Sequence, residues 1–131
     1  MRTVDYVILY VDDLASSISF YRDVLGLEFR FEESGYAEFS TGATKFGLME
    51  RSRLPDLIGR EAPAGPPGGE VLFLVEDVDA EADRLRAAGA RILTGPTDRP
   101  WGHRTLHLAD PEGHVIELAQ EIPRTAPPRA E

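Results

Sequence analysis

Alternating apolar and polar positions mark the strands of this chain, and one strand–turn–helix pattern occurs twice. Residues 4–11 alternate and are rich in Val, Ile, Leu and Tyr, which predicts a strand. Residues 70–75 repeat this pattern, and both segments lead through an acidic turn into a segment with helical spacing. Leu25-Gly26 then recurs as Ala88-Gly89. A repeat of this length predicts one supersecondary unit that is used twice.

Each unit is predicted to follow the order β-α-β-β-β. The first helix is expected to be capped by Ser16 or Ser17 and to end at Gly26. The strand that follows it alternates, which places Phe29 and Phe31 on one face. The second helix covers about 79–88, with Ala82, Leu85 and Ala88 directed inward. The remaining predicted strands are residues 27–33, 36–40, 45–50, 90–93, 103–109 and 115–120, with a turn-rich stretch at 94–102.

The units are predicted to form a single domain over residues 1–131. Module one covers about 4–50, and module two covers about 70–120. Residues 51–69 are rich in proline and glycine and form the linker, with a short helical turn around 54–58. The tail at 121–131 is rich in proline and arginine, and we expect it to be disordered.

Composition removes several classes of function. The chain has 131 residues and no cysteine, which excludes disulfides, thiolate metal sites and a cysteine nucleophile. A formal net charge of -9 argues against nucleic acid as a partner and favours cationic ligands. The sequence shows neither a signal peptide nor a membrane span, so we expect a cytoplasmic protein without a membrane partner.

Several motifs resemble the vicinal oxygen chelate superfamily, also called the glyoxalase/bleomycin resistance/dioxygenase superfamily. They are Val11-Asp12-Asp13-Leu14 with FYRDVLGL at 20–27, EDVDA at 76–80, Trp101-Gly102, DPEG at 110–113 and IEL at 116–118. The resemblance spans roughly residues 4–120. It implies an α+β fold in which two paired β-α-β-β-β modules form an open, cleft-enclosing sheet, within a homodimer. Function does not follow, because this scaffold serves several kinds of enzyme as well as drug-binding proteins without catalysis.

The metal positions implied by the resemblance are poorly filled in this chain. The first-strand ligand falls on Tyr6 and its counterpart on Glu70, where metal-dependent members carry histidine. The last-strand ligand falls on Glu117, which matches, and its counterpart falls on or near Gly47. A tyrosine is a poor ligand because its ordinary pKa is about 10. We therefore expect no cofactor, and we keep a divalent metal held by Glu70, His107 and Glu117 as the alternative.

Alternation along residues 103–109 separates the leucines from the histidines. Leu106 and Leu108 pack under the helices, which directs His107 and His103 toward the cleft, with His107 beside Glu117. The pair is interpreted either as a group that moves a proton or recruits a metal, or as a hydrogen-bonded polar lining. His114 is expected to be exposed to solvent.

Aromatic residues complete the candidate site. Tyr6 and Tyr10 share a face by the two-residue period, Tyr36 flanks the neighbouring hairpin, and Trp101 lies at the cleft rim in the family pattern. Rings and carboxylates together suit a flat, partly cationic organic ligand. The leading hypothesis is a metal-independent protein that sequesters an antibiotic or another aromatic natural product, as in the bleomycin-resistance-like branch. The alternatives are a metal-dependent lyase, isomerase or dioxygenase, and a protein whose ligand is lost or is a partner protein.

Overall fold

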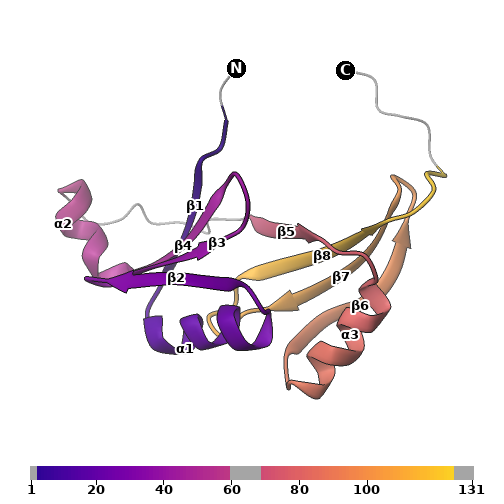
Figure 1. Ribbon diagram of the computed structural model, residues 1–131, viewed down its shortest axis with the longest axis horizontal. Helices are drawn as coiled ribbons and strands as arrows, with labels where there is room; N and C mark the ends of the chain where they lie inside the picture. The colour runs from indigo at the N-terminus through magenta and orange to yellow at the C-terminus, as the bar shows by residue number, and fades with distance from the viewer. Residues whose placement is uncertain (1–2, 60–68, 126–131) are drawn as a thin grey trace. The chain divides into compact units, whose positions relative to one another are not determined.

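The computed structural model describes residues 3–59 and 69–125, and the chain divides into two compact units, Met1–Pro67 and Gly68–Glu131 (Figure 1). The elements of the first unit are β1 (Tyr6–Val11), α1 (Leu14–Ser19), the π-helical turn η1 (Phe20–Val24), β2 (Glu28–Glu33), β3 (Tyr36–Ser40), β4 (Lys45–Glu50), the 3₁₀ turn η2 (Arg51–Arg53) and α2 (Leu54–Ile58). Those of the second are β5 (Glu70–Leu74), α3 (Val78–Ala87), β6 (Arg91–Arg99), β7 (His103–Ala109) and β8 (Val115–Glu121).

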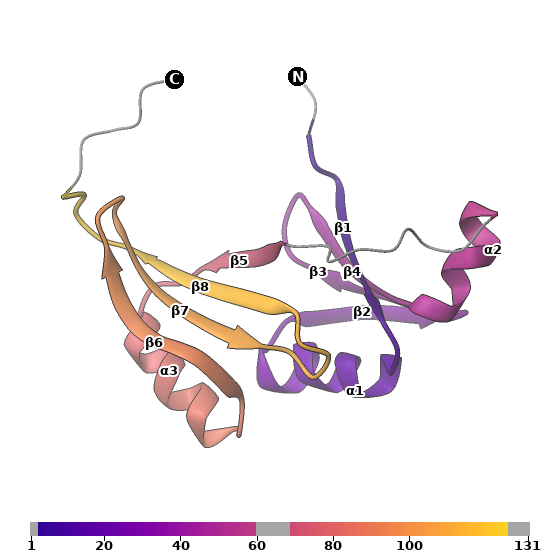
Figure 2. The same cartoon turned by 180° about the vertical axis from the view of Figure 1, so that it is seen from behind.

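Each unit contains a four-stranded mixed sheet with the same topology. Sheet A has the order β1-β4-β3-β2, and sheet B has the order β5-β8-β7-β6 (Figure 2). The first and last strands of each unit pair in parallel, and the other pairs are antiparallel. The predicted β-α-β-β-β repeat and its fold class are therefore confirmed.

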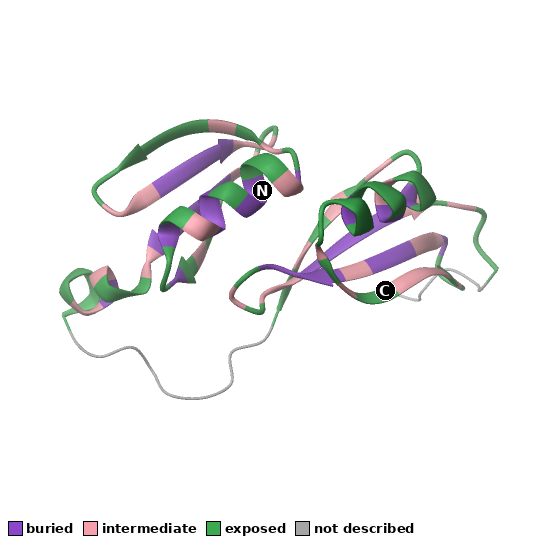
Figure 3. Ribbon diagram, turned by 90° about the horizontal axis from the view of Figure 1, so that it is seen from below, coloured by how far each residue is buried: buried purple, intermediate pink, exposed green. Residues whose placement is uncertain are grey.

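The helical segment α1–η1 covers one face of sheet A, and α3 covers one face of sheet B. The core of each unit lies between its helix and its own sheet. In the first unit the ring of Tyr21 packs 4.9 Å from that of Phe46 and 6.2 Å from that of Phe39. In the second unit Leu85 of α3 is fully buried with Leu106 and Leu108 of β7. Figure 3 shows this burial along the inner strands. The opposite face of each sheet is consequently left for function.

Both helices begin at an aspartate at equivalent points of the repeat. Asp13 accepts a hydrogen bond from the backbone N–H of Ser16, and Asp77 accepts one from Ala80, each at 3.1 Å. The predicted caps Ser16 and Ser17 are wrong, because the acidic turn itself supplies the N-cap carboxylate. Ser17 is instead buried against the core.

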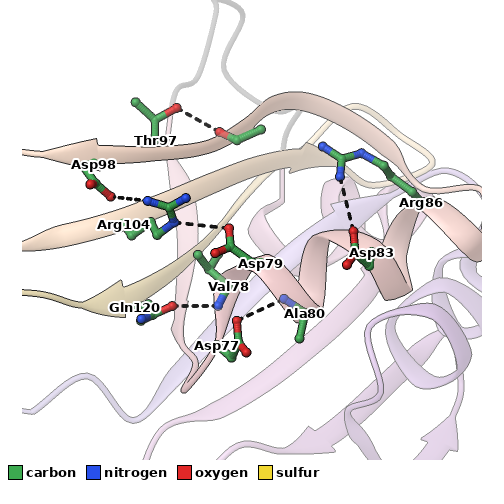
Figure 4. A network of polar contacts seen from close by, with 11 residues as sticks. Asp77, Val78, Asp79, Ala80, Asp83, Arg86, Thr97, Asp98, Arg104 and Gln120 are labelled. Carbon is green, nitrogen blue, oxygen red and sulfur yellow. Dashed lines mark hydrogen bonds and ion pairs between the residues drawn. The ribbon is translucent and has the colours of Figure 1, made fainter.

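Polar contacts fix the start of α3 to sheet B (Figure 4). The side-chain oxygen of Gln120 accepts a hydrogen bond from the backbone N–H of Val78 at 2.9 Å. Arg104 on β7 bonds Asp79 of α3 at 3.2 Å and Asp98 of β6 at 2.7 Å. Gln120 and Arg104 therefore mark the helix-facing side of β8 and β7.

A β-bulge in β2 overturns the strict alternation predicted for this strand. Phe29 pairs with Phe39, whereas Phe31 pairs with Glu38, so Arg30 is an extra residue. The bulge moves Phe31 to the face opposite that of Phe29. The predicted shared face of these two phenylalanines is therefore wrong.

The second unit also departs from the predicted pattern. β6 runs to Arg99 with register shifts between Ile92 and Thr97, so most of the predicted turn-rich stretch is strand. Ala88 is exposed rather than directed inward. His114 is half-buried rather than solvent-exposed, because its Nδ1 lies 2.7 Å from Oδ2 of the buried Asp110.

The linker and the tail were predicted only in part. The helical turn around 54–58 is confirmed as α2. The start of the tail is ordered, since the backbone N–H groups of Ile122 and Thr125 donate to the carbonyls of Gly102 and Pro100. Residues 60–68 and 126–131 lie outside the described residues. Within the described residues, no helix has the length and apolarity that crossing a membrane requires.

Candidate functional site

The candidate site lies on the face of sheet B that points away from α3. His107 pairs with Glu117 across β7 and β8, as the alternation predicted, and the parallel pairing of β5 with β8 brings Glu70 beside them. The Nε2 atom of His107 lies 3.2 Å from Oε1 of Glu117 and 3.6 Å from Oε2 of Glu70. We call Glu70, His107 and Glu117 the acidic cluster.

Burial of Glu117 disfavours the charged form of this carboxyl group within the acidic cluster. The Glu117 side chain is 9% exposed, compared with 43% for Glu70. Burial raises the pKa of Glu117 above its ordinary value, Glu70 raises it further, and His107 acts in the opposite direction. The two carboxylates therefore favour a shared proton or a cation between them.

The chemistry of the acidic cluster fits a divalent metal ion. One ligand atom from each residue can be chosen so that all lie within 4.8 Å of one another. One imidazole and two carboxylates suit Mn, Fe or Zn and would leave coordination positions open for substrate oxygens. The same three groups equally suit an organic cation, because the carboxylates supply negative charge without requiring coordination geometry.

Other residues on the same face follow from the register of β6 and β7. Thr105 pairs with Thr97 and lies two residues before His107, and His103 pairs with Arg99 one step further along. His103 is thus on the predicted face but four residues from His107, roughly 13 Å along the strand, so it does not join the acidic cluster. Arg99 was missed, because the sequence pattern ends the strand at Leu93.

Trp101 lies beyond this row of residues, in the turn between β6 and β7. Its side chain is among the exposed large apolar groups, at 51%. Its carbonyl accepts a hydrogen bond from Arg124 at 3.1 Å. The indole is therefore available to a ligand while its backbone is held in place.

In the first unit, the predicted tyrosines share the face of sheet A that points away from α1. Tyr6, Ile8 and Tyr10 are 52%, 40% and 38% exposed, respectively. Lys45 Nζ lies 5.3 Å from the centre of the Tyr6 ring, within the range of a cation–π contact. Tyr36 lies on the same face, because it pairs with Met49, which in turn pairs with Tyr10.

Tyr36 belongs to a polar network that the sequence pattern did not predict. Its hydroxyl donates to Oε1 of Glu38 at 2.9 Å, and Nη1 of Arg30 lies 2.5 Å from Oε2 of the same carboxylate. Glu38 is only 4% exposed, so the network satisfies a buried charge. Burial and the neighbouring Glu38 raise the pKa of Tyr36, which keeps the phenol protonated.

Gly47 allows the Tyr36 ring to lie directly across β4. A Cβ atom at position 47 would come within 2.5 Å of the Tyr36 hydroxyl and 2.6 Å of Cε1. The position implied for a metal ligand in the first unit is thus covered by an aromatic ring. Tyr6 and Gly47 leave the first unit without a histidine or carboxylate at either of the implied ligand positions.

Comparisons with known proteins agree with this architecture. The chain is 35% identical over 117 residues to the uncharacterized protein YraH of Bacillus subtilis, covering 84% of this chain and 91% of that protein. It is 30% identical over 123 residues to a probable lactoylglutathione lyase of Vibrio parahaemolyticus, covering 88% of each. A crystal structure of a glyoxalase/bleomycin resistance protein/dioxygenase from Nocardioides superposes with a TM-score of 0.82 at 25% identity, covering 100% of this chain and 91% of that chain.

A sequence profile provides the family assignment. The profile of the Glyoxalase/Bleomycin resistance protein/Dioxygenase superfamily matches residues 3–118, which include the acidic cluster and every strand except the last three residues of β8. The repeat, the paired sheet topology and this match agree with one another. The chain therefore belongs to the glyoxalase/bleomycin resistance protein/dioxygenase superfamily.

Proposed function

We propose that this protein binds a small organic molecule without a metal ion, and that the acidic cluster receives a cationic group of that molecule. The observation that carries the proposal is the pair of carboxylates, Glu70 and Glu117, which converge on His107 and form no ion pair with an arginine or lysine of the described residues. A protonated amine or amidine would compensate the charge of both carboxylates and counteract burial and Glu70, which raise the pKa of Glu117.

The exposed aromatic side chains support an aromatic ligand. Tyr6 and Tyr10 in the first unit and Trp101 in the second unit present exposed rings, and aromatic rings bind flat organic cations by stacking and by cation–π attraction. Sequestration of an antibiotic or another natural product is the biological role we propose for such binding. The proposal includes a homodimer in the cytoplasm of a bacterium. Size-exclusion chromatography with light scattering would test the oligomeric state.

The first unit supports a mode of binding that needs no metal. At the implied ligand positions it offers a phenol, Tyr6, and a glycine covered by Tyr36. At these positions the first unit therefore offers a metal ion neither a histidine nor a carboxylate. Two carboxylates and one imidazole on one sheet face can instead hold an ammonium group by charge-assisted hydrogen bonds.

The test is a fluorescence titration of chelator-treated protein with proflavine, a flat aromatic cation. We expect saturable binding that Glu117→Gln weakens by about tenfold, the effect of one charge-assisted hydrogen bond. Glu81→Gln is the matched control, because it makes the same chemical change on α3, where Glu81 already pairs with Arg84. Equal weakening by both variants, or binding that requires added metal, would count against the proposal.

A second candidate function is a metal-dependent lyase, isomerase or dioxygenase. It is favoured by the ligand atoms of the acidic cluster, which lie within 4.8 Å of one another. The probable lactoylglutathione lyase among the relatives points in the same direction. In this case Glu117 and Glu70 would hold the ion with His107, and the ion would polarise a substrate oxygen.

Thermal unfolding separates the two candidates. Chelator-treated protein is heated with and without Mn, Ni, Zn, Fe(II) and Mg, since a ligand that binds only the folded state raises the melting temperature. A rise that chelator reverses and that Glu117→Gln abolishes would favour the metal-dependent enzyme. The metal-free proposal expects the same melting temperature with every metal.

A further inference from the structure

We infer that Arg99 recognises an anionic group on the molecule that binds this face of sheet B, so that the ligand is zwitterionic. This inference rests on the proposed function and deepens it by naming the class of ligand. The cationic group would lie at the acidic cluster, and a carboxylate or phosphate would lie at Arg99.

Arg99 is held on the ligand-facing side of the sheet by a buried hydroxyl. Its pairing with His103 places its side chain on the same face as Thr105. Its Nε donates to Oγ1 of Thr105 at 3.0 Å, and Thr105 is only 1% exposed. A guanidinium fixed at Nε keeps its terminal N–H groups in one orientation, which lowers the entropy lost when it binds an anion.

Arg99 differs from most of the described arginines in its partners. Among the described residues, six arginines pair with a carboxylate within 3.8 Å, namely Arg22, Arg30, Arg51, Arg84, Arg86 and Arg104. Arg53 and Arg91 also form no ion pair with a described carboxylate, but Arg53 donates to the carbonyl of Ser34 and Arg91 is exposed. Among the described residues, Arg99 has no carboxylate partner, and its terminal nitrogens make no hydrogen bond. The chain has 23 acidic residues against 14 basic ones, and Arg99 is half-buried, so the anionic group of a ligand would supply the partner that the described carboxylates do not.

The neighbouring carboxylates do not supply that anion. Asp98 alternates to the other face of β6 and bonds Arg104 at 2.7 Å. Glu121 lies in the same row of the sheet, because both Arg99 and Glu121 pair with His103, but it forms no ion pair with Arg99. The guanidinium therefore remains available on the face that carries the acidic cluster.

The spacing along β7 sets the length of the ligand. Thr105, which anchors Arg99, lies two residues from His107, a separation of about 7 Å along a strand. Both side chains stand on the same face, because successive side chains alternate. A cationic and an anionic group joined by one para-substituted benzene ring match this separation.

The experiment compares para-aminomethylbenzoate with its methyl ester on the chelator-treated full chain, using calorimetric or NMR titration. Both carry the ammonium group, and only the acid carries an anion. We expect the acid to bind about tenfold more tightly than the ester, the effect of one partly exposed charge-assisted contact. Arg99→Gln should remove this preference without changing the affinity of the ester.

Two further variants control for charge and folding. Arg86→Gln removes the same charge from α3 and should leave the preference intact. Arg99→Lys keeps the charge but loses the planar fork, so it should retain part of the preference. It also provides a folded comparison if Arg99→Gln is unstable.

The outcomes separate this inference from the proposed function. Equal binding of acid and ester, or a preference that survives Arg99→Gln, would overturn the role of Arg99 while the cation site stands. Binding of neither compound would contradict both the inference and the cation site. A preference lost in Arg99→Gln and kept in Arg86→Gln would establish the zwitterionic ligand class.

Discussion

Gly47→Ala should destabilise the first unit by displacing the Tyr36 ring. The added Cβ would lie 2.5 Å from the hydroxyl, 2.6 Å from Cε1 and 2.8 Å from Cζ of Tyr36. These distances are far inside van der Waals contact, so the ring must move. Its movement breaks the 2.9 Å hydrogen bond to Glu38, a carboxylate that is only 4% exposed.

The magnitude follows from what Glu38 loses and retains. A hydrogen bond to a charged group contributes about 1.5–3 kcal/mol. Arg30 still pairs with the carboxylate, so Glu38 is not left as an unpaired buried charge. Alanine is intrinsically better than glycine in a strand, which offsets about 0.5–1 kcal/mol. We therefore expect a net loss of about 1–2 kcal/mol in the free energy of unfolding.

Urea unfolding of a double-mutant cycle tests this reasoning. Tyr36→Ala removes the ring, so Gly47→Ala should then be neutral or slightly stabilising, which corresponds to a coupling energy of about 1.5–3 kcal/mol. Gly69→Ala is the matched control, because a Cβ there meets nothing within 4 Å. Additive effects in the cycle, or equal costs at positions 47 and 69, would refute the proposed overlap of Tyr36 with Gly47.

Three further predictions concern the second unit and the repeat. In chelator-treated protein, Glu117→Gln should increase the free energy of unfolding at neutral pH but not at acidic pH. The pKa of Glu117 is higher in the folded than in the unfolded protein, so the wild type loses stability as pH rises through that raised pKa, and the glutamine variant does not. Urea unfolding across pH checks this, and a difference independent of pH would contradict it. Trp101→Ala should weaken proflavine binding by about 1–3 kcal/mol in the fluorescence titration, and unchanged affinity would remove Trp101 from the site. Asp13→Ala and Asp77→Ala should each cost about 1 kcal/mol in urea unfolding, since both are N-caps, and an effect at only one would refute equivalent caps.

The repeat allowed most of the fold to be predicted from sequence. Matching apolar patterns at 4–11 and 70–75 identified β1 and β5. The recurrence of Gly26 as Gly89 indicated where the helical segment of each unit ends. The bulge at Arg30 was not predictable, because an extra residue leaves the local apolar pattern unchanged and is visible only in the register with β3. β6 was cut short because Gly95 and Pro96 look like a turn, whereas the register shifts accommodate them.

The sequence predicted those contacts of the candidate site that follow from local alternation, and it missed those that depend on the register between strands. His107 opposite Glu117 follows from alternation on adjacent strands, so sequence alone sufficed. The proximity of Glu70 depends on parallel pairing with a strand 45 residues later, which only the family resemblance suggested. Arg99 required the register of β6, and Glu38 required knowledge that Tyr36 and Arg30 converge on it. Long-range pairings carry this information, and local periodicity does not.

The two units carry different side chains at equivalent positions of their sheets. This difference indicates which sheet face is suited to bind a ligand. Glu38 pairs with Gly47 in sheet A as His107 pairs with Glu117 in sheet B. In the first unit, the buried carboxylate at this point is already neutralised by Arg30 and bonded by Tyr36. In the second unit, the acidic cluster contacts no arginine or lysine among the described residues, and Arg99 bonds only a hydroxyl nearby. Glu117 is buried beside Glu70, so a bound cation would stabilise this face and Arg99 could bind an anionic group of the same molecule. Sheet B is therefore where ligand binding should first be sought.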